Sequence, residues 1–404
     1  MINIKITLTS LSLIGKTVLF LLLYLGLSLH TSAQKKLPVI RASGRQATIY
    51  DGKVVPWGLD PKVRLDIYYV NIPRRKNKVT LVTDQDKISF KTKYGENYDF
   101  VVLLNGKDSC FTRISAKQGP GPQAISNESF PDTIPFTLRG SRIYFQGLLN
   151  GKEKVSIQFD TGAGTSCVSK ASSERLNLSF AGKTTLSNSQ GINEVRKSSN
   201  NNLTIGNLSF ASIPLIETGN MQPGEDLIIG NYFFGDKIVE IDYDKKLFIV
   251  HEKLPAAAKK FTKQRMVYGL NIKARIEQAG KKYSYWFGFD TGRDGTMLLR
   301  QDFTEQAGVW KNLKELTILN GRKIVRLDAK IAGVKFRDIV TNAADPSIPE
   351  ARRAGSLFGN VILNHFNVIL DNRQGYIYLK PNSRINEPYS DYKSYESEMR
   401  KLKR

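Results

Sequence analysis

The chain has 404 residues, of which 41% are hydrophobic, and a formal net charge of +23 at pH 7. Without an N-terminal leader about 370 residues remain, enough for two or three domains with cores of their own. The charge favours anionic partners such as acidic polymers or acidic substrates. Its Lys and Arg residues are scattered along strand-like segments rather than gathered in one recognition helix or arm, so we do not expect nucleic acid to be a partner.

Residues 1–33 predict a signal peptide. Lys5 and Lys16 precede an apolar stretch, 18–29, and the small residues of 31–33 offer a cleavage site before Gln34. An apolar run of about a dozen residues is typical of a signal peptide and is short for a spanning helix. We therefore expect export to the periplasm or beyond the cell, with no stable membrane insertion once the signal is removed. An uncleaved anchor is the alternative.

Residues 34–120 predict a small β-domain. Four strand-like runs rich in β-branched and aromatic residues occur here, and Asn105-Gly106 is a hairpin turn signal; the runs are 64–70, 79–82, 87–90 and 100–104. A stretch rich in Gly and Pro follows, and we place a linker at 121–129. Two roles are open for this domain. It is an accessory domain that docks on the rest of the protein or on the envelope, or it is a basic prosegment that lies in an acidic cleft until it is removed.

Two later segments, 155–166 and 285–296, repeat one pattern. Each is an apolar, strand-like run that ends in Phe-Asp-Thr-Gly, which places Asp160 and Asp290 at equivalent positions. The landmarks after each Asp recur at nearly the same distance. They are an Asn/Gln-Gly turn 31 residues on in both copies (Gly191, Gly321), an apolar-apolar-Gly-Asn segment 70 and 69 residues on (Gly230, Gly359), and a strand ending in Asp 82 and 81 residues on (Asp242, Asp371). An offset of about 130 residues indicates two copies of a small domain rather than a solenoid.

Such a duplication predicts a paired carboxylate site. Equivalent surfaces meet at a twofold axis, so we expect Asp160 and Asp290 to face each other there. Two carboxylates a few ångströms apart cannot both ionise, and the pair can then act as acid and base together. One Asp-Thr-Gly alone is often only a turn, because Asp and Gly are favoured in turns; the matched repeat favours the paired site.

With Asp160-Thr161-Gly162-Ala163 as it stands, the chain resembles the aspartic proteases over roughly residues 130–382. More specifically, it is similar to the bacterial retropepsin-like and pepsin-like aspartyl proteases with two lobes in one chain. The resemblance implies an all-β fold with two tandem retropepsin-like barrels. These would be lobe 1 at 130–255 and lobe 2 at 256–383, followed by a charged C-terminal tail at 384–404.

The resemblance also implies roles for individual residues. Asp160 and Asp290 would be catalytic and would hold the attacking water, with no covalent intermediate, no cofactor and no metal. The residues that support the pair would be Thr161, Gly162, Thr291 and Gly292. Flap hairpins carrying Gly191 and Gly321 would close over the substrate. The segments Ile229-Gly230 and Phe358-Gly359 would cross behind the two Asp turns and brace them.

The second copy departs from this pattern, because Arg293 stands where the family usually has Ala, Ser or Thr, and Asp294 follows it. A guanidinium beside the pair favours ionisation of both carboxylates and lowers their pKa, and acid catalysis would then fail. Alternatively, Arg293 points outward and pairs with Asp294 or another neighbouring acid. The sequence leaves both open.

We therefore expect an exported aspartic endopeptidase that acts on peptide or protein substrates as a monomer with pseudo-twofold lobes. The alternative is a non-catalytic peptide- or glycan-binding protein that keeps the fold. The 3 His residues are not part of a Gly-x-Ser-x-Gly or a His-Glu-x-x-His motif, so neither a triad hydrolase nor a zinc peptidase is expected. Cys110 and Cys167 form a disulfide that ties the first domain to lobe 1, or they are two buried thiols.

Overall fold

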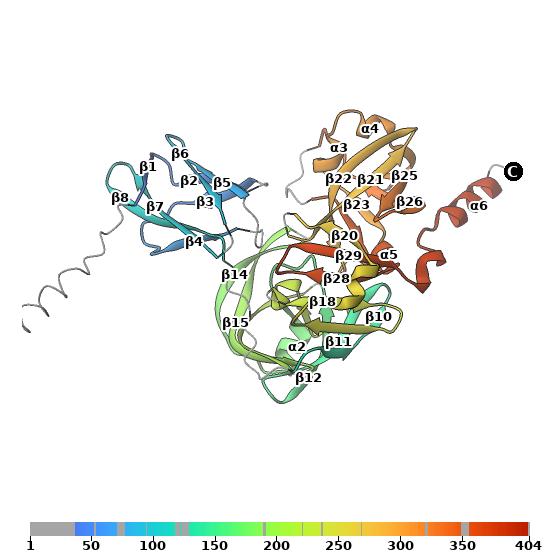
Figure 1. The fold of residues 1–404 in the computed structure, drawn as a ribbon, viewed down its shortest axis with the longest axis horizontal. Helices are drawn as coiled ribbons and strands as arrows, with labels where there is room; N and C mark the ends of the chain where they lie inside the picture. The colour runs from blue at the N-terminus through green and yellow to red at the C-terminus, as the bar shows by residue number, and fades with distance from the viewer. Residues whose placement is uncertain are drawn as a thin grey trace, which may run out of the picture.

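The computed structural model describes residues 37–51, 54–70, 77–93, 95–117, 122, 129–188, 191–219, 221–235, 237–267, 269–319, 322–348 and 355–402. The predicted signal peptide, most of the predicted linker and Gly321 lie outside the described residues. Figure 1 shows eight strands in a body of their own at one side, two barrels that share a middle sheet, and a C-terminal helix at the far side.

The first body is a β-sandwich of two four-stranded sheets, ordered β1-β7-β8-β4 and β3-β2-β5-β6. Its strands are β1 (Val39–Ala42), β2 (Gln46–Tyr50), β3 (Val54–Gly58), β4 (Asp66–Tyr69), β5 (Asn77–Val82), β6 (Lys87–Thr92), β7 (Asn97–Leu104) and β8 (Asp108–Ser115). Buried and less buried residues alternate along β7 and β8, as expected of strands with one face on a core. Asn105 and Gly106 both have positive φ and join β7 to β8, so the predicted hairpin turn is confirmed.

The sandwich has its own core, which includes Ile49, Val79 and Phe100. Cys110 is buried in it, Cys167 is buried in lobe 1, and both thiols are free, so no disulfide joins the two bodies. None of the described sandwich strands pairs with a strand of either barrel. The sheets of the two lobes therefore form without any strand from the sandwich.

Lobe 1 is a barrel with the strand order β10-β11-β12-β17-β13-β16-β15-β14, closed by pairing of β11 with β15. Its elements are β10 (Thr137–Arg139), β11 (Arg142–Leu149), β12 (Glu153–Phe159), β13 (Cys167–Ser169), α2 (Lys170–Arg175), β14 (Phe180–Asn188), β15 (Gly191–Ile205), β16 (Leu208–Thr218), β17 (Leu227–Ile229) and η2 (Asn231–Phe234). The short strand β17 inserts between β12 and β13, parallel to the first and antiparallel to the second.

Lobe 2 repeats this arrangement with the order β21-β22-β27-β23-β26-β25-β24, closed by β21 and β25. Its elements are β21 (Asn271–Gln278), β22 (Lys281–Asp290), β23 (Met297–Leu299), α3 (Gln301–Thr304), α4 (Val309–Asn312), β24 (Lys314–Leu319), β25 (Arg322–Ile331), β26 (Val334–Ala343), β27 (Leu357–Gly359) and α5 (Asn360–Leu363). Here β27 inserts between β22 and β23 in the same orientations. The predicted all-β fold with two tandem barrel lobes is confirmed.

A six-stranded sheet, ordered β20-β29-β28-β18-β19-β9, joins the lobes. Its strands are β9 (Asp132–Pro135), β18 (Ile238–Asp242), β19 (Leu247–His251), β20 (Thr262–Arg265), β28 (Phe366–Asp371) and β29 (Tyr376–Pro381), and η3 (Ala256–Lys260) precedes β20. Each lobe contributes three strands, and the pseudo-twofold axis passes between β18 and β28, which pair antiparallel with Val239 opposite Leu370. Figure 1 shows these strands between the two barrels.

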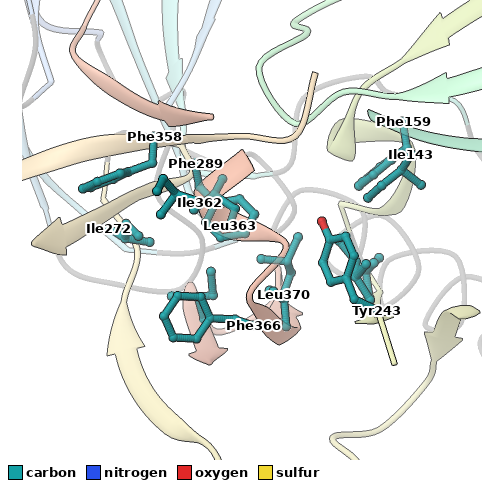
Figure 2. Close-up of a cluster of buried hydrophobic side chains, with 14 of the residues drawn as sticks. Ile143, Phe159, Tyr243, Ile272, Phe289, Phe358, Ile362, Leu363, Phe366 and Leu370 are labelled. Carbon is teal, nitrogen blue, oxygen red and sulfur yellow. The ribbon is translucent and has the colours of Figure 1, made fainter. Parts of the chain in front are cut away.

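One hydrophobic core runs through both lobes and the shared sheet. Figure 2 shows Ile143 and Phe159 of lobe 1 on one side of it, Phe289 and Phe358 of lobe 2 on the other, and Leu370 of the shared sheet between them. Because this core is continuous, the lobes are fixed relative to one another. The strands β12 and β22, which lead to the two Asp residues, both contribute to it.

The C-terminal region carries η4 (Ser383–Asn386) and α6 (Tyr392–Leu402). Ahead of α6, the Tyr389 hydroxyl accepts the Arg337 N–H at 2.7 Å and donates to the Arg337 carbonyl at 2.9 Å. These bonds fasten the start of the charged tail to β26. Among the described helices, none has the length and apolar character that crossing a bilayer requires.

Candidate active site

Asp160 and Asp290 lie at the ends of equivalent strands, each with a second strand inserted behind it. The Asp160 N–H donates to the Ile229 carbonyl in β17 at 2.9 Å, and Asp290 pairs with Gly359 in β27. A Cβ at Gly230 would clash with the Ala163 carbonyl, and one at Gly359 with the Gly295 carbonyl. Both glycines are therefore required by the close approach of the Asp loops, which agrees with their predicted bracing role.

The two Asp loops are tied together by their threonines across the pseudo-twofold axis. The Thr161 N–H donates to the Thr291 hydroxyl at 3.0 Å, and the Thr291 N–H donates to the Thr161 hydroxyl at 2.9 Å. Each hydroxyl in turn donates to the carbonyl before the opposite Asp, at Phe289 and Phe159, at 2.5 and 2.9 Å. Thr291 is fully buried. This network fixes the separation of Asp160 and Asp290.

The two carboxyl groups meet above the glycines of the opposite loops, close enough for the charge of Asp290 to raise the pKa of Asp160. A Cβ at Gly162 would lie 2.9 Å from the Asp290 Cγ, and one at Gly292 would clash with the Asp160 carboxyl. The Gly162 N–H donates to Asp160 Oδ1 at 2.7 Å, and the Gly292 N–H donates to Asp290 Oδ1 at 3.0 Å. Each predicted supporting glycine thus binds its own Asp and leaves room for the other.

This environment raises the pKa of both aspartates. For Asp160 burial is the largest cause, followed by the charge of Asp290 and the hydrogen bond to it. For Asp290 burial also raises the pKa, and the bond from Asp160, the N–H groups of Gly292 and Arg293 and the Arg293 charge offset part of that rise. Two carboxyls with raised pKa values this close together are suited to hold one proton between them. Such a pair can supply an acid and a base at the same place.

The Arg293 side chain does not lie on the carboxylates. Its backbone N–H donates to Asp290 Oδ1 at 3.1 Å, while its Nε donates to the Met297 carbonyl at 3.2 Å. The guanidinium lies against Gly295, where a Cβ would be 3.4 Å from its Nε. Among the described residues, no carboxylate is within ion-pair distance of it. Neither alternative left open by the sequence is found: the guanidinium is not on the carboxylates, and it does not pair with Asp294.

Asp294 instead reaches across to lobe 1, which the sequence did not indicate. Its Oδ1 accepts the Ser141 N–H at 2.9 Å and the Ser141 hydroxyl at 2.7 Å, and its Oδ2 lies 3.8 Å from Arg142 Nη1. Arg142 Nε also donates to the Gly292 carbonyl at 2.9 Å. Ser141 directly precedes β11 and Arg142 begins it, about 150 residues away in the chain. This contact positions the loop that carries Asp290.

We expect Asp294→Ala to lower the free energy of unfolding by about 1–3 kcal/mol, because it leaves the Ser141 N–H without its charged acceptor. It should also lower kcat/KM for peptide cleavage, since the Gly292 loop loses part of its anchor. Asp294→Asn, which keeps one oxygen acceptor, should fall between this variant and the wild type. Urea unfolding measures the first effect and peptide kinetics the second. A stability equal to that of the wild type in Asp294→Ala would refute this role.

The glycines predicted for the flaps belong to equivalent hairpins. Gly191 begins β15 and pairs with Asn188 at the end of β14. In lobe 2, Leu319 of β24 pairs with Arg322 of β25, and Gly321 falls between them, outside the described residues. Ile318 and Leu319 at the end of β24 are 63% and 60% exposed. Each barrel therefore ends in one long hairpin, and that of lobe 2 carries apolar side chains at its tip.

Comparison with known proteins gives a family match for part of the chain. Residues 145–236 match the family model described as gag-polyprotein putative aspartyl protease, a segment that contains Asp160, Thr161 and Gly162. Among solved structures, 430 chains match. One is the crystal structure of an aspartic proteinase from Irpex lacteus, at 12% identity and a TM-score of 0.45, covering 64% of this chain and 99% of that one. No curated protein matches the chain.

Proposed function

We propose that the chain, whose residues 145–236 match an aspartyl protease family model, is an exported endopeptidase whose catalytic pair is Asp160 and Asp290. The observation that carries the proposal is the approach of the two carboxyls, each of which lies against the glycine of the opposite loop and has a raised pKa. The cross-bonded Thr161 and Thr291 support it, because they hold the two loops in register.

The mechanism follows from a pair that holds one proton. The ionised carboxylate takes a proton from a water molecule, and that water attacks the carbonyl carbon of the scissile peptide bond. The protonated carboxyl donates its hydrogen bond to the carbonyl oxygen, where negative charge develops. Breakdown of the tetrahedral species returns a proton to the leaving nitrogen. Which carboxyl takes which part is a property of the coupled pair rather than of one residue.

In this proposal, the hairpins β14–β15 and β24–β25 close over the bound substrate. The exposed Ile318 and Leu319 support this role, because apolar side chains at a hairpin tip are buried when the tip folds onto a bound peptide. Loop closure would also exclude water from the dyad and strengthen its electrostatics. Export rests on the predicted signal peptide, and cleavage before Gln34 is checked by sequencing the N-terminus of the mature protein.

A non-catalytic peptide-binding protein is the second candidate, and Arg293 in place of a small residue is the observation in its favour. Against it stands the position of the side chain: its Nε donates to the Met297 carbonyl, and only its backbone N–H contacts Asp290. The guanidinium therefore leaves the two carboxyls in place over the glycines of the opposite loops. The catalytic reading is the better supported of the two.

The test is digestion of unfolded β-casein by the purified chain from Gln34 onward, at several pH values from acidic to neutral, with product ends mapped by mass spectrometry. Asp160→Asn and Asp290→Asn preparations exclude a contaminating protease. Cleavage by the wild type that both variants lose supports the proposal. Cleavage that persists in either variant contradicts the dyad, and no cleavage at any pH contradicts the enzyme.

A further inference from the structure

The wall of lobe 1 beside Asp160 is apolar. Cys167, Leu186 and Ile216 form a small buried cluster, against which three partly buried apolar side chains pack, namely Val195, Met221 and Ile228. Cys167 pairs with Ile228 of β17, and Ile228 pairs with Gln158, two residues before Asp160, so this cluster lies beside the strand that leads to the catalytic carboxyl. Its members come from β13, β14, β15, β16 and β17 together with the loop before β17.

Lobe 2 differs from lobe 1 at the residue that follows its Asp-Thr-Gly. Arg293 stands where lobe 1 has Ala163, and its side chain is half-buried. The nearby charges of Arg300 and Arg322 lower its pKa in addition to burial, which lowers it most, while Asp290 opposes them. Arg322 begins β25 in the hairpin of lobe 2, so both the Asp290 loop and this hairpin bring charges that act on the guanidinium.

This guanidinium is held by one nitrogen only. Nε donates to the Met297 carbonyl, and within the described residues Nη1 and Nη2 make no hydrogen bond. A partly desolvated guanidinium with two open nitrogens is suited to a bidentate bond with a carboxylate. The described part of the chain places no carboxylate within ion-pair distance of this guanidinium. We therefore expect the carboxylate to belong to the substrate.

We propose that Arg293 is a specificity residue that binds a substrate carboxylate on the Asp290 side of the scissile bond, while the apolar wall of lobe 1 accepts a hydrophobic side chain on the other side. The substrate class is then a peptide with an Asp or Glu side chain, or a free terminal carboxylate, near the bond. This inference rests on the proposed function for the reaction, but the binding preference can be measured without turnover. The net charge of +23 attracts such substrates at long range.

The experiment uses peptides in which the scissile amide is replaced by a hydroxyethylene group, so that binding is measured whether or not the protein cleaves. Glu is placed in turn at each of the four positions nearest that group, and each peptide is compared with its Gln counterpart. We expect wild-type protein to bind one Glu peptide about tenfold more tightly than its Gln counterpart, the effect typical of a charge-assisted pair. Arg293→Gln should reduce this ratio to about 1.

Three further variants separate specificity from structure. Arg293→Lys keeps the charge and should keep a reduced preference for Glu, whereas Arg293→Glu should prefer a Lys peptide. Lys107→Gln, in the turn between β7 and β8, removes one positive charge far from the pair and should keep the full wild-type ratio. Thermal unfolding of each variant shows whether it has folded, and Arg293→Lys carries the test if the Gln variant has not.

Equal binding of all Glu and Gln pairs by the wild type would overturn the inference, as would a preference that Arg293→Gln leaves intact. Kinetics with cleavable versions of the same peptides then separate the two proposals. A Glu preference in binding without any turnover contradicts the proposed function and keeps the inference. Turnover that depends on Asp160 but shows no Glu preference supports the proposed function and contradicts the inference.

Discussion

Replacement of either Asp160 or Asp290 by Asn is expected to lower kcat/KM for peptide cleavage about 10³-fold or more, because the reaction needs both an ionised and a protonated carboxyl. The double variant should be no slower than the worse single variant, since the two residues act as one unit. A fluorogenic peptide measures all three. Asp338→Asn, at a carboxylate of β26 that pairs with Arg326 and not with the dyad, is the control and should keep wild-type activity.

Asp160→Asn should also change the stability of the fold, and the pKa of Asp160 gives the direction of that change. Burial raises the folded-state pKa of Asp160 above its unfolded value. The stability that the protonated group contributes is therefore complete below the unfolded pKa and is lost as the pH rises through the folded pKa. Asp160→Asn, which stays neutral, should then melt at a higher temperature than the wild type at neutral pH. A lower melting temperature would show that the variant lost activity by losing its fold.

The second large effect is expected from Thr291→Val. Val keeps the shape of Thr but has no hydroxyl, so the Thr161 N–H and the Phe159 carbonyl lose their partner inside the protein. At about 1–3 kcal/mol for each buried polar group left unpaired, the free energy of unfolding should fall by about 2–5 kcal/mol. Activity should fall with it, because these bonds set the separation of the two carboxyls. Chemical denaturation and kcat/KM are the two measurements.

A matched control for this substitution is Thr204 of β15. Within the described residues, its hydroxyl bonds to the Ser209 hydroxyl of β16 at 3.1 Å and to no other group. Thr204→Val should change stability by less than about 0.5 kcal/mol and leave kcat/KM unchanged. A Thr291→Val protein that behaves like Thr204→Val would show that the cross-bonded threonines do not hold the site together.

The duplication was the strongest signal in the sequence. Matching distances from Asp160 and Asp290 predict two copies of one domain, and the all-β two-lobed fold confirms that reading. The same distances lead to Gly230 and Gly359, where any Cβ would meet a backbone carbonyl of the Asp loop. A repeat of this kind survives in the sequence because backbone contacts leave little freedom in the residues that make them.

Contacts between the lobes could not be predicted in the same way. Asp294 bonds to Ser141, 153 residues away, and nothing in the local pattern of either segment indicates it. The neighbour in sequence, Arg293, is the more obvious partner, but its side chain points to the Met297 carbonyl and lies against Gly295. The direction of the Arg293 side chain depends on the position of the Met297 carbonyl and on the room beside Gly295, and both are set by how the loop folds.

The most direct test of the central claim, that Asp160 and Asp290 share one proton, is the pH dependence of kcat/KM for the wild type beside Asp290→Asn. Burial raises the pKa of both carboxyls, while the Arg293 charge offsets part of the rise at Asp290. The shared proton should therefore persist to higher pH than in an exposed Asp pair. The account predicts a bell-shaped profile that extends towards neutral pH and disappears in Asp290→Asn. Activity in that variant, or a wild-type rate that does not change with pH, would contradict it.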